Sequence, residues 1–212
     1  MAGDLDDAIA LGTEVVRAAR QLGVTHLVGY ASFVLAHALV ERDPARARRL
    51  LQEGIELGAA HQLEDSALVI VPMLVAAHLR DRSLTLELGP RAVKHVHWTG
   101  DLPQLAGLLN VIAWAAASEP EAGARLQGAA RRIALRDRPQ PPAQADAPPG
   151  DRAATGGTAS LIGDLRREAT ARIVEHLGDS RLRDLRAEGE MMDIDQAVSF
   201  ALALIERSRA GP

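Results

Sequence analysis

Hydrophobic residues of this 212-residue chain recur mostly at spacings of three and four, which is the period of an α-helix. Four of the amphipathic segments begin with an acidic residue and repeat at a period of about 38 residues. Their first residues are Asp4, Asp43, Asp81 and Glu119. A carboxylate at a helix start accepts hydrogen bonds from free backbone amides and complements the helix dipole. We therefore expect a helix to begin at each of these positions.

Each repeat also places a small residue and a leucine at fixed distances from its start. The small residues are Ala8, Ala47, Thr85 and Gly123, and the leucines are Leu11, Leu50, Leu88 and Leu126. A small side chain lets a neighbouring helix approach closely, and a leucine one turn later can pack into that contact. The register therefore predicts that both positions are buried in every repeat.

Three further segments, residues 25–42, 65–79 and 102–117, are apolar nearly all round, as expected for helices held between two neighbours. One amphipathic and one buried helix per repeat predict an all-α fold, a tetratricopeptide-like α-solenoid of helical hairpins. An irregular helical bundle with accidental spacing is the alternative. Pro72 and the Gly89–Pro90 pair fall inside predicted helices, so we expect the third repeat to be kinked or irregular.

The composition after the fourth repeat changes twice, which divides the chain into three parts. We expect the repeat array over residues 1–134, a loop or linker rich in proline and glycine over 135–160, and C-terminal capping helices of the same domain over 161–212. In the cap, Gly178 should end one helix and Asp193 should cap the last one. The capping helices are expected to cover the exposed end of the array.

Composition narrows the classes of function. With 25% charged residues of mixed sign and a net charge of −4, the chain lacks the basic excess typical of proteins that bind nucleic acid directly. It contains no cysteine, which excludes disulfides and zinc–thiolate sites. The longest apolar run, residues 67–79, is too short to cross a bilayer, and the N-terminus has no secretion signal pattern. We therefore expect a cytoplasmic protein without membrane contact.

The C-terminal half carries a more specific pattern. It reads EPEAGARLQGAARRI from Glu119, then a proline-rich connector, and RAEGEMMDIDQAVSFALAL from Arg186. This pattern resembles the tail of large bacterial signal-transduction ATPases, including transcriptional regulators of the LuxR and AfsR types and proteins fused to adenylate cyclases. The chain departs from it in its longer connector and at Leu182 and Arg186, where the family often has Phe and Trp.

The resemblance implies a sensor or scaffold region for signal transduction, with tetratricopeptide-like helices downstream of an ATPase module. The chain itself has no glycine-rich phosphate-binding loop ending in Gly-Lys-Ser/Thr and no catalytic constellation. We therefore expect a non-enzymatic module for protein–protein interaction or regulation, without a cofactor. Its expected partner is a protein or peptide: upstream ATPase or regulator domains, or a second copy of the chain in a homodimer.

Four residues are candidates for contact with a partner or ligand: Tyr30, His37, Asn110 and Trp114. They lie on the predicted inner helices, which line the groove of a solenoid, although core packing is the alternative, above all for Trp114. A small-molecule sensor with an inducer in this groove is the alternative function.

Two histidines and a basic cluster form two further groups of candidate residues. His95 and His97 point to different helix faces, so a shared metal is not expected. The basic residues Arg131, Arg132, Arg136 and Arg138 are candidates for contact with an acidic partner or a nucleotide-bearing domain, or are simply solvated.

Overall fold

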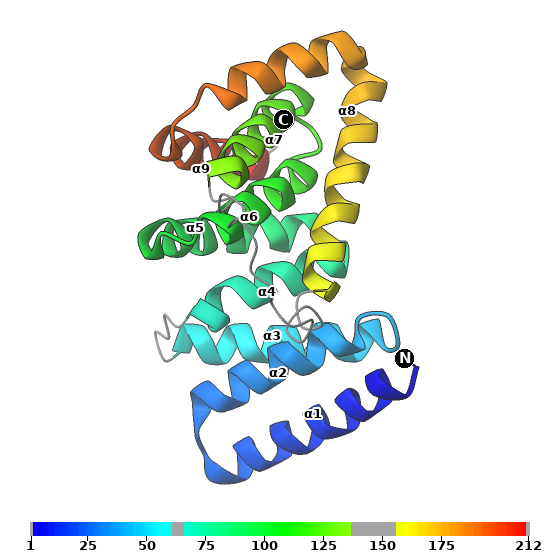
Figure 1. The fold of residues 1–212 in the computed structure, drawn as a ribbon. Helices are drawn as coiled ribbons and strands as arrows, with labels where there is room; N and C mark the ends of the chain where they lie inside the picture. Colours follow the sequence, from blue (N-terminus) through cyan, green and yellow to red (C-terminus); the bar gives the residue numbers. More distant parts are fainter. Residues whose placement is uncertain (1, 61–65, 137–155, 211–212) are drawn as a thin grey trace, which may run out of the picture. The chain divides into compact units, whose positions relative to one another are not determined.

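The computed structural model describes residues 2–60, 66–136 and 156–210. Within these ranges the chain forms nine α-helices and no strand, so the all-α prediction is confirmed for this part of the chain (Figure 1). The residues fall into two compact units, 1–88 and 89–212, and each is described by itself. No described helix is both long enough and apolar enough to cross a membrane.

The first unit contains α1 (Ala2–Leu22), α2 (Thr25–Leu39), α3 (Pro44–Ala60), α4 (Ser66–His78) and the start of α5 (Arg82–Thr99). Helix α2 packs against α1, α3 and α4. Its Phe33 side chain is 1% exposed and lies against Gly54 of α3, where a Cβ atom would lie 2.8 Å from the Cζ atom of Phe33. Gly54 thus permits the close approach of α2 and α3.

Both register positions are buried in the second and fourth repeats, whereas in the third Thr85 is buried and Leu88 is only partly buried. Ala47, Leu50 and Leu126 are all buried. In the first repeat the prediction is wrong: Ala8 is exposed, and 64% of the Leu11 side chain is accessible. Helix α1 packs on α2 through the face that carries Gly12 and Val16, and Leu11 points about 100° away from Gly12.

Three of the expected helix caps are present. The Asp43 and Asp81 carboxylates accept backbone N–H groups of Arg46 and Leu84 at 2.9 and 3.0 Å. Asp193 accepts the Gln196 amide at 2.8 Å, and the Gln196 side chain accepts the Asp193 amide in return, which forms a reciprocal capping box. The carboxylate of Glu119 instead binds Arg207 of α9, while α7 begins at Pro120.

Helices α4 and α5 contain Pro72 and Pro90 and continue past them. The boundary between the two units falls between Leu88 and Gly89, directly before Pro90. The remaining part of α5 belongs to the second unit, where Val93 and Val96 are buried.

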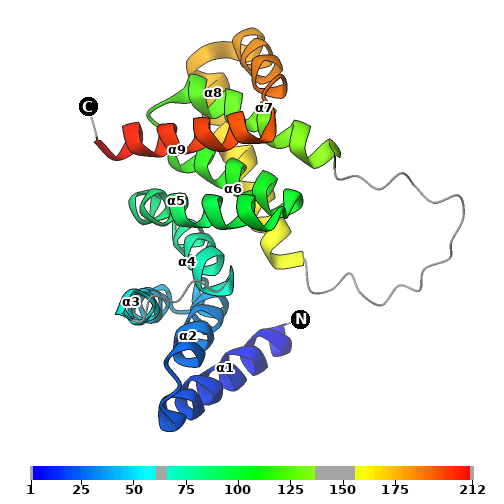
Figure 2. The same ribbon diagram turned by 90° about the vertical axis from the view of Figure 1, so that its left-hand side faces the viewer.

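The second unit also contains α6 (Leu102–Ala115), α7 (Pro120–Arg136), α8 (Gly156–Glu190) and α9 (Ile194–Ala210). Helix α7 packs against α6, α8 and α9, and Figure 2 shows α9 lying beside it. The predicted break at Gly178 is confirmed, because this residue has φ 76° and ψ 163° inside α8. Ile173 before the break and Leu185 after it both pack with Ala124 of α7. Of the predicted 135–160 linker, residues 137–155 lie outside the described residues.

Candidate functional site

An open groove of about 1000 Å³ lies in the second unit between α6, α7 and the first part of α8. Small side chains line much of it, among them Ala106 and Gly107 of α6 and Ala130 and Ala134 of α7. At Gly107 a Cβ atom would lie 3.0 Å from the Cδ1 atom of Ile162 in α8. The groove is therefore bounded by helices that approach closely through small residues.

A polar cluster forms part of the groove lining. Arg186 donates from Nη2 to Oε1 of Gln127 at 2.6 Å and to Oγ1 of Thr170 at 2.8 Å. The Thr170 hydroxyl donates to the same Gln127 oxygen at 3.3 Å, and Nε2 of Gln127 donates to the Arg166 carbonyl at 3.4 Å. Gln127 is 4% exposed, and Arg186 is half-buried. Gln127 of α7 and Thr170 in the first part of α8 thus hold the guanidinium of Arg186, which belongs to the second part of α8.

Among the residues that the structure describes, the groove is lined by no acidic residue and by four arginines, Arg131, Arg166, Arg167 and Arg186. Arg131 forms an ion pair with Glu190 at 3.1 Å, and Arg167 forms one with Asp164. Within the described ranges, Arg166 and Arg186 have no carboxylate at ion-pair distance.

The electrostatics of Arg186 follow from this arrangement. Burial lowers the pKa of its guanidinium, and the positive charges of Arg166 and Arg131 lower it further, against an opposing effect of Glu190. An arginine stays protonated at any physiological pH, so it serves here as a fixed cation and hydrogen-bond donor and not as a proton shuttle. The arrangement suits the binding of an anion.

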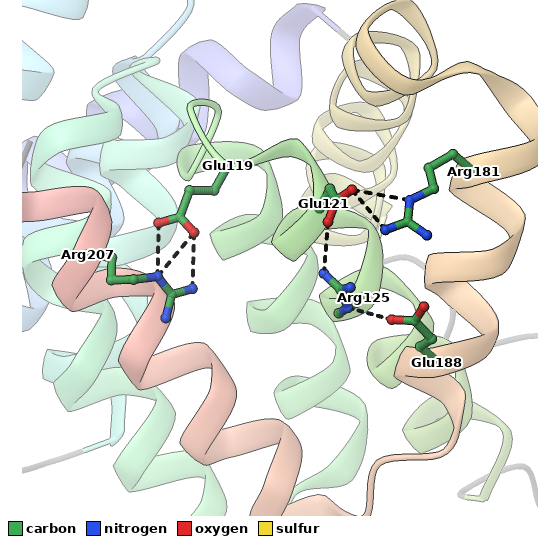
Figure 3. Close-up of polar contacts among 6 residues, drawn as sticks. All are labelled: Glu119, Glu121, Arg125, Arg181, Glu188 and Arg207. Atoms are coloured by element: carbon green, nitrogen blue, oxygen red, sulfur yellow. Dashed lines mark hydrogen bonds and ion pairs between the residues drawn. The ribbon is translucent and has the colours of Figure 1, made fainter. Parts of the chain in front are cut away.

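Ion pairs link α7 to the second part of α8, and Glu119, just before α7, to Arg207 of α9 (Figure 3). Glu121 pairs with Arg181 at 2.9 Å and with Arg125 at 3.5 Å, and Arg125 in turn pairs with Glu188 at 2.7 Å. The hydrogen bond from Arg181, together with the charges of Arg181 and Arg125, holds the pKa of the Glu121 carboxyl below its usual range. These contacts fix the second part of α8, and therefore Arg186, relative to α7.

The candidate residues from the sequence lie in different places. Tyr30 and His37 belong to the first unit, where Tyr30 is 47% exposed and the His37 ring centroid lies 5.4 Å from that of His78. Asn110 lines the groove of the second unit; its Nδ2 donates to the Ala106 carbonyl at 2.9 Å, and its Oδ1 is buried without a hydrogen-bond partner among the described residues. Trp114 is 1% exposed and lies in the core.

The two histidines of α5 have separate surroundings. His97 lies with its Nε2 2.8 Å from Oδ1 of Asp195, and the His95 ring centroid lies 6.4 Å from that of Trp98. The described residues contain no group of three or more side chains able to hold a metal ion. Of the basic cluster at the end of α7, Arg131 lines the groove, Arg132 and Arg136 are exposed, and Arg138 lies outside the described residues.

Sequence reasoning missed the polar cluster as a site. Its members Gln127, Thr170 and Arg186 lie far apart in the chain, so only the packing of α8 on α7 brings them together. The one signal was Arg186 itself, a cation at a position where the resembled family often has an aromatic residue.

Comparison of the chain with protein-family models, curated proteins and solved structures found no match.

Proposed function

We propose that this chain is a non-enzymatic binding module that holds a polypeptide partner in the groove on α6, α7 and α8. The observation that carries the proposal is the groove itself, which is open and lined by small apolar side chains and by a half-buried arginine with neutral hydrogen-bond partners. An open groove admits an extended segment or a surface loop of another domain, whereas a small ligand is usually buried over most of its surface.

The resemblance to the tails of signal-transduction ATPases supports a regulatory role for this binding. In that reading the helices form a tetratricopeptide-like array, and the partner comes from an ATPase or regulator domain. The packing of α2 on three neighbours and of α7 on three neighbours supports the array within each unit, because such repeats contact mainly their neighbours.

A small-molecule sensor is the second candidate. The groove volume of about 1000 Å³ lies at the upper end of the range of small-ligand sites, and several polar groups line it. A ligand of this kind would have to leave much of its surface in contact with solvent.

Site-specific photo-crosslinking in the native host tests the proposal. A benzoylphenylalanine is placed at Ala171, which is exposed and lines the groove, and in a matched variant at Ala187, which is exposed on the same helix but does not line it. We expect a crosslinked polypeptide at Ala171 and not at Ala187. Adducts at Ala187 alone would contradict the proposal, and a retained mass of a few hundred daltons in a native mass spectrum would favour the sensor.

A further inference from the structure

The groove has a positive charge that the described residues do not balance. Of the four arginines in its lining, two already pair with a carboxylate, and no acidic residue lines the groove. Arg166 and Arg186 therefore present positive charge to any occupant of the groove.

The hydrogen bonds of Arg186 leave two guanidinium nitrogens without a partner among the described residues. Both of its bonds to Gln127 and Thr170 come from Nη2, and its Nε and Nη1 have no hydrogen-bond partner in the described part of the chain. Each fork of the planar guanidinium that could bind both oxygens of a carboxylate includes Nη2, which is already engaged, so Nε–H and Nη1–H are left to donate single charge-assisted hydrogen bonds to carboxylate oxygens. Gln127 and Thr170 hold the guanidinium in one orientation, so an incoming carboxylate finds its donors already positioned.

The rest of the lining distinguishes between classes of anion. As far as the structure describes it, the lining consists largely of small or aliphatic side chains, such as Ala130, Ala134 and Ile162, and includes no aromatic residue. Single-stranded nucleic acids bind by stacking their bases on aromatic side chains, so this lining does not suit them. The net charge of −4 on the whole chain also opposes a polyphosphate backbone. Small apolar walls suit the methylene groups and backbone of a polypeptide.

We propose that the occupant of the groove is an acidic polypeptide segment, with an Asp or Glu carboxylate bound by the guanidinium of Arg186 and flanked by Arg166. This inference rests on the proposed function, because it assigns the chemistry of the partner that the groove holds. It makes Arg186 the residue that selects the partner's charge.

Nuclear magnetic resonance of the full chain, with labelled arginine side chains and isoleucine methyl groups, tests this assignment. The probes are the peptides acetyl-Glu-Glu-Glu-amide and acetyl-Gln-Gln-Gln-amide, and inorganic phosphate, each titrated into the millimolar range. The Nε–H signal of Arg186 reports the carboxylate contact, and the Ile162 methyl signal reports occupancy of the groove. Arg132, which is exposed on α7 and does not line the groove, serves as the internal control.

We expect the Glu peptide to shift the Arg186 signal saturably and to leave Arg132 nearly unchanged. Arg186→Gln should weaken binding of this peptide by about tenfold or more, while Arg132→Gln should leave it unchanged. Arg166→Gln, at an exposed position, should weaken it several-fold without a risk to folding, which keeps the test valid if Arg186→Gln unfolds.

Four results would overturn the inference. Equal shifts of Ile162 by the Glu and Gln peptides would remove the acidic selectivity while leaving the groove as a polypeptide-binding surface. Phosphate binding at Arg186 more tightly than the Glu peptide would assign the site to a phosphate group. Shifts of Arg132 as large as those of Arg186 would show charge attraction without a site, and the absence of any response at Ile162 would count against the proposed function as well.

Discussion

Two glycines set the distance between α7 and the second part of α8. A Cβ atom at Gly128 would lie 2.9 Å from both the Cα and the carbonyl carbon of Arg186, and one at Gly189 would lie 2.7 Å from the carbonyl carbon of Arg125. The two contacts are reciprocal, since each glycine faces the backbone of the other helix. This close approach brings Arg186 within hydrogen-bond distance of Gln127.

Replacement of Gly128 by alanine should therefore destabilise the second unit. Ordinary contact begins near 3.4 Å, so α8 would have to withdraw by more than about half an ångström, and backbone atoms cannot rotate out of the way. Overpacking of this kind costs about 1–3 kcal/mol or more, and the better helix propensity of alanine returns about 1 kcal/mol. Because the clash is with backbone atoms, the cost should lie at the upper end of this range, about 3 kcal/mol, so we expect a net loss of about 2 kcal/mol in the free energy of unfolding.

The assay is urea unfolding followed by the fluorescence of Trp114, which is buried in the second unit, with Trp98→Phe as the background. Gly163→Ala is the matched control, because its Cβ would meet only the flexible end of Arg167 at 3.5 Å; it should be neutral or stabilising by up to about 1 kcal/mol.

A double-mutant cycle sharpens the test. Gly128→Ala and Gly189→Ala push apart the same two helices, so the double variant should lose less stability than the sum of the two single variants. The reasoning would be refuted by a Gly128→Ala variant as stable as Gly163→Ala, or by strictly additive losses.

Three further predictions concern stability. Ser32 is fully buried, and its hydroxyl has no hydrogen-bond partner among the described residues. Ser32→Ala should therefore raise the free energy of unfolding by about 1 kcal/mol in urea titrations followed by circular dichroism. A loss of stability in this variant would show that the hydroxyl has a hydrogen-bond partner. Burial holds the pKa values of His37 and His78 below the ordinary value, so the unfolded chain takes up protons at a higher pH than the folded chain does. The first unit should therefore lose stability as pH falls below about 6.5, and His37→Gln should flatten this dependence. The pKa of Glu121 is lowered, so its pairing with Arg181 stabilises the fold above about pH 4.3, and this stabilisation is lost as pH falls below that value. Glu121→Gln should therefore remove part of the acid sensitivity that Trp114 fluorescence reports. An unchanged acid profile of this variant would contradict the prediction.

Local sequence signals predicted the helices and several of their ends. The acidic caps at Asp43 and Asp81 and the capping box at Asp193 depend on residues three positions apart, which the sequence shows directly. The break at Gly178 was predictable for the same reason, since a glycine readily adopts a positive φ.

Predictions that needed tertiary information were less complete. Leu11 follows the repeat register but lies on the side of α1 that does not face α2, and the spacing alone does not show which neighbours a helix has. The small residues of the EPEAGARLQGAARRI segment predicted a close helix contact, and Gly128 makes one with α8. The sequence did not show that this contact places Arg186 beside Gln127 and Thr170, because that depends on how α8 packs on α7.

The central claim is that the groove binds an acidic polypeptide through Arg186. The most direct test is the yield of crosslinked polypeptide at Ala171 in the native host, compared between the otherwise unaltered chain and the Arg186→Gln and Arg132→Gln variants. We predict an adduct rich in Asp and Glu whose yield falls about tenfold in Arg186→Gln and is unchanged in Arg132→Gln. An equal yield in Arg186→Gln, at an equal amount of folded protein, would contradict the claim.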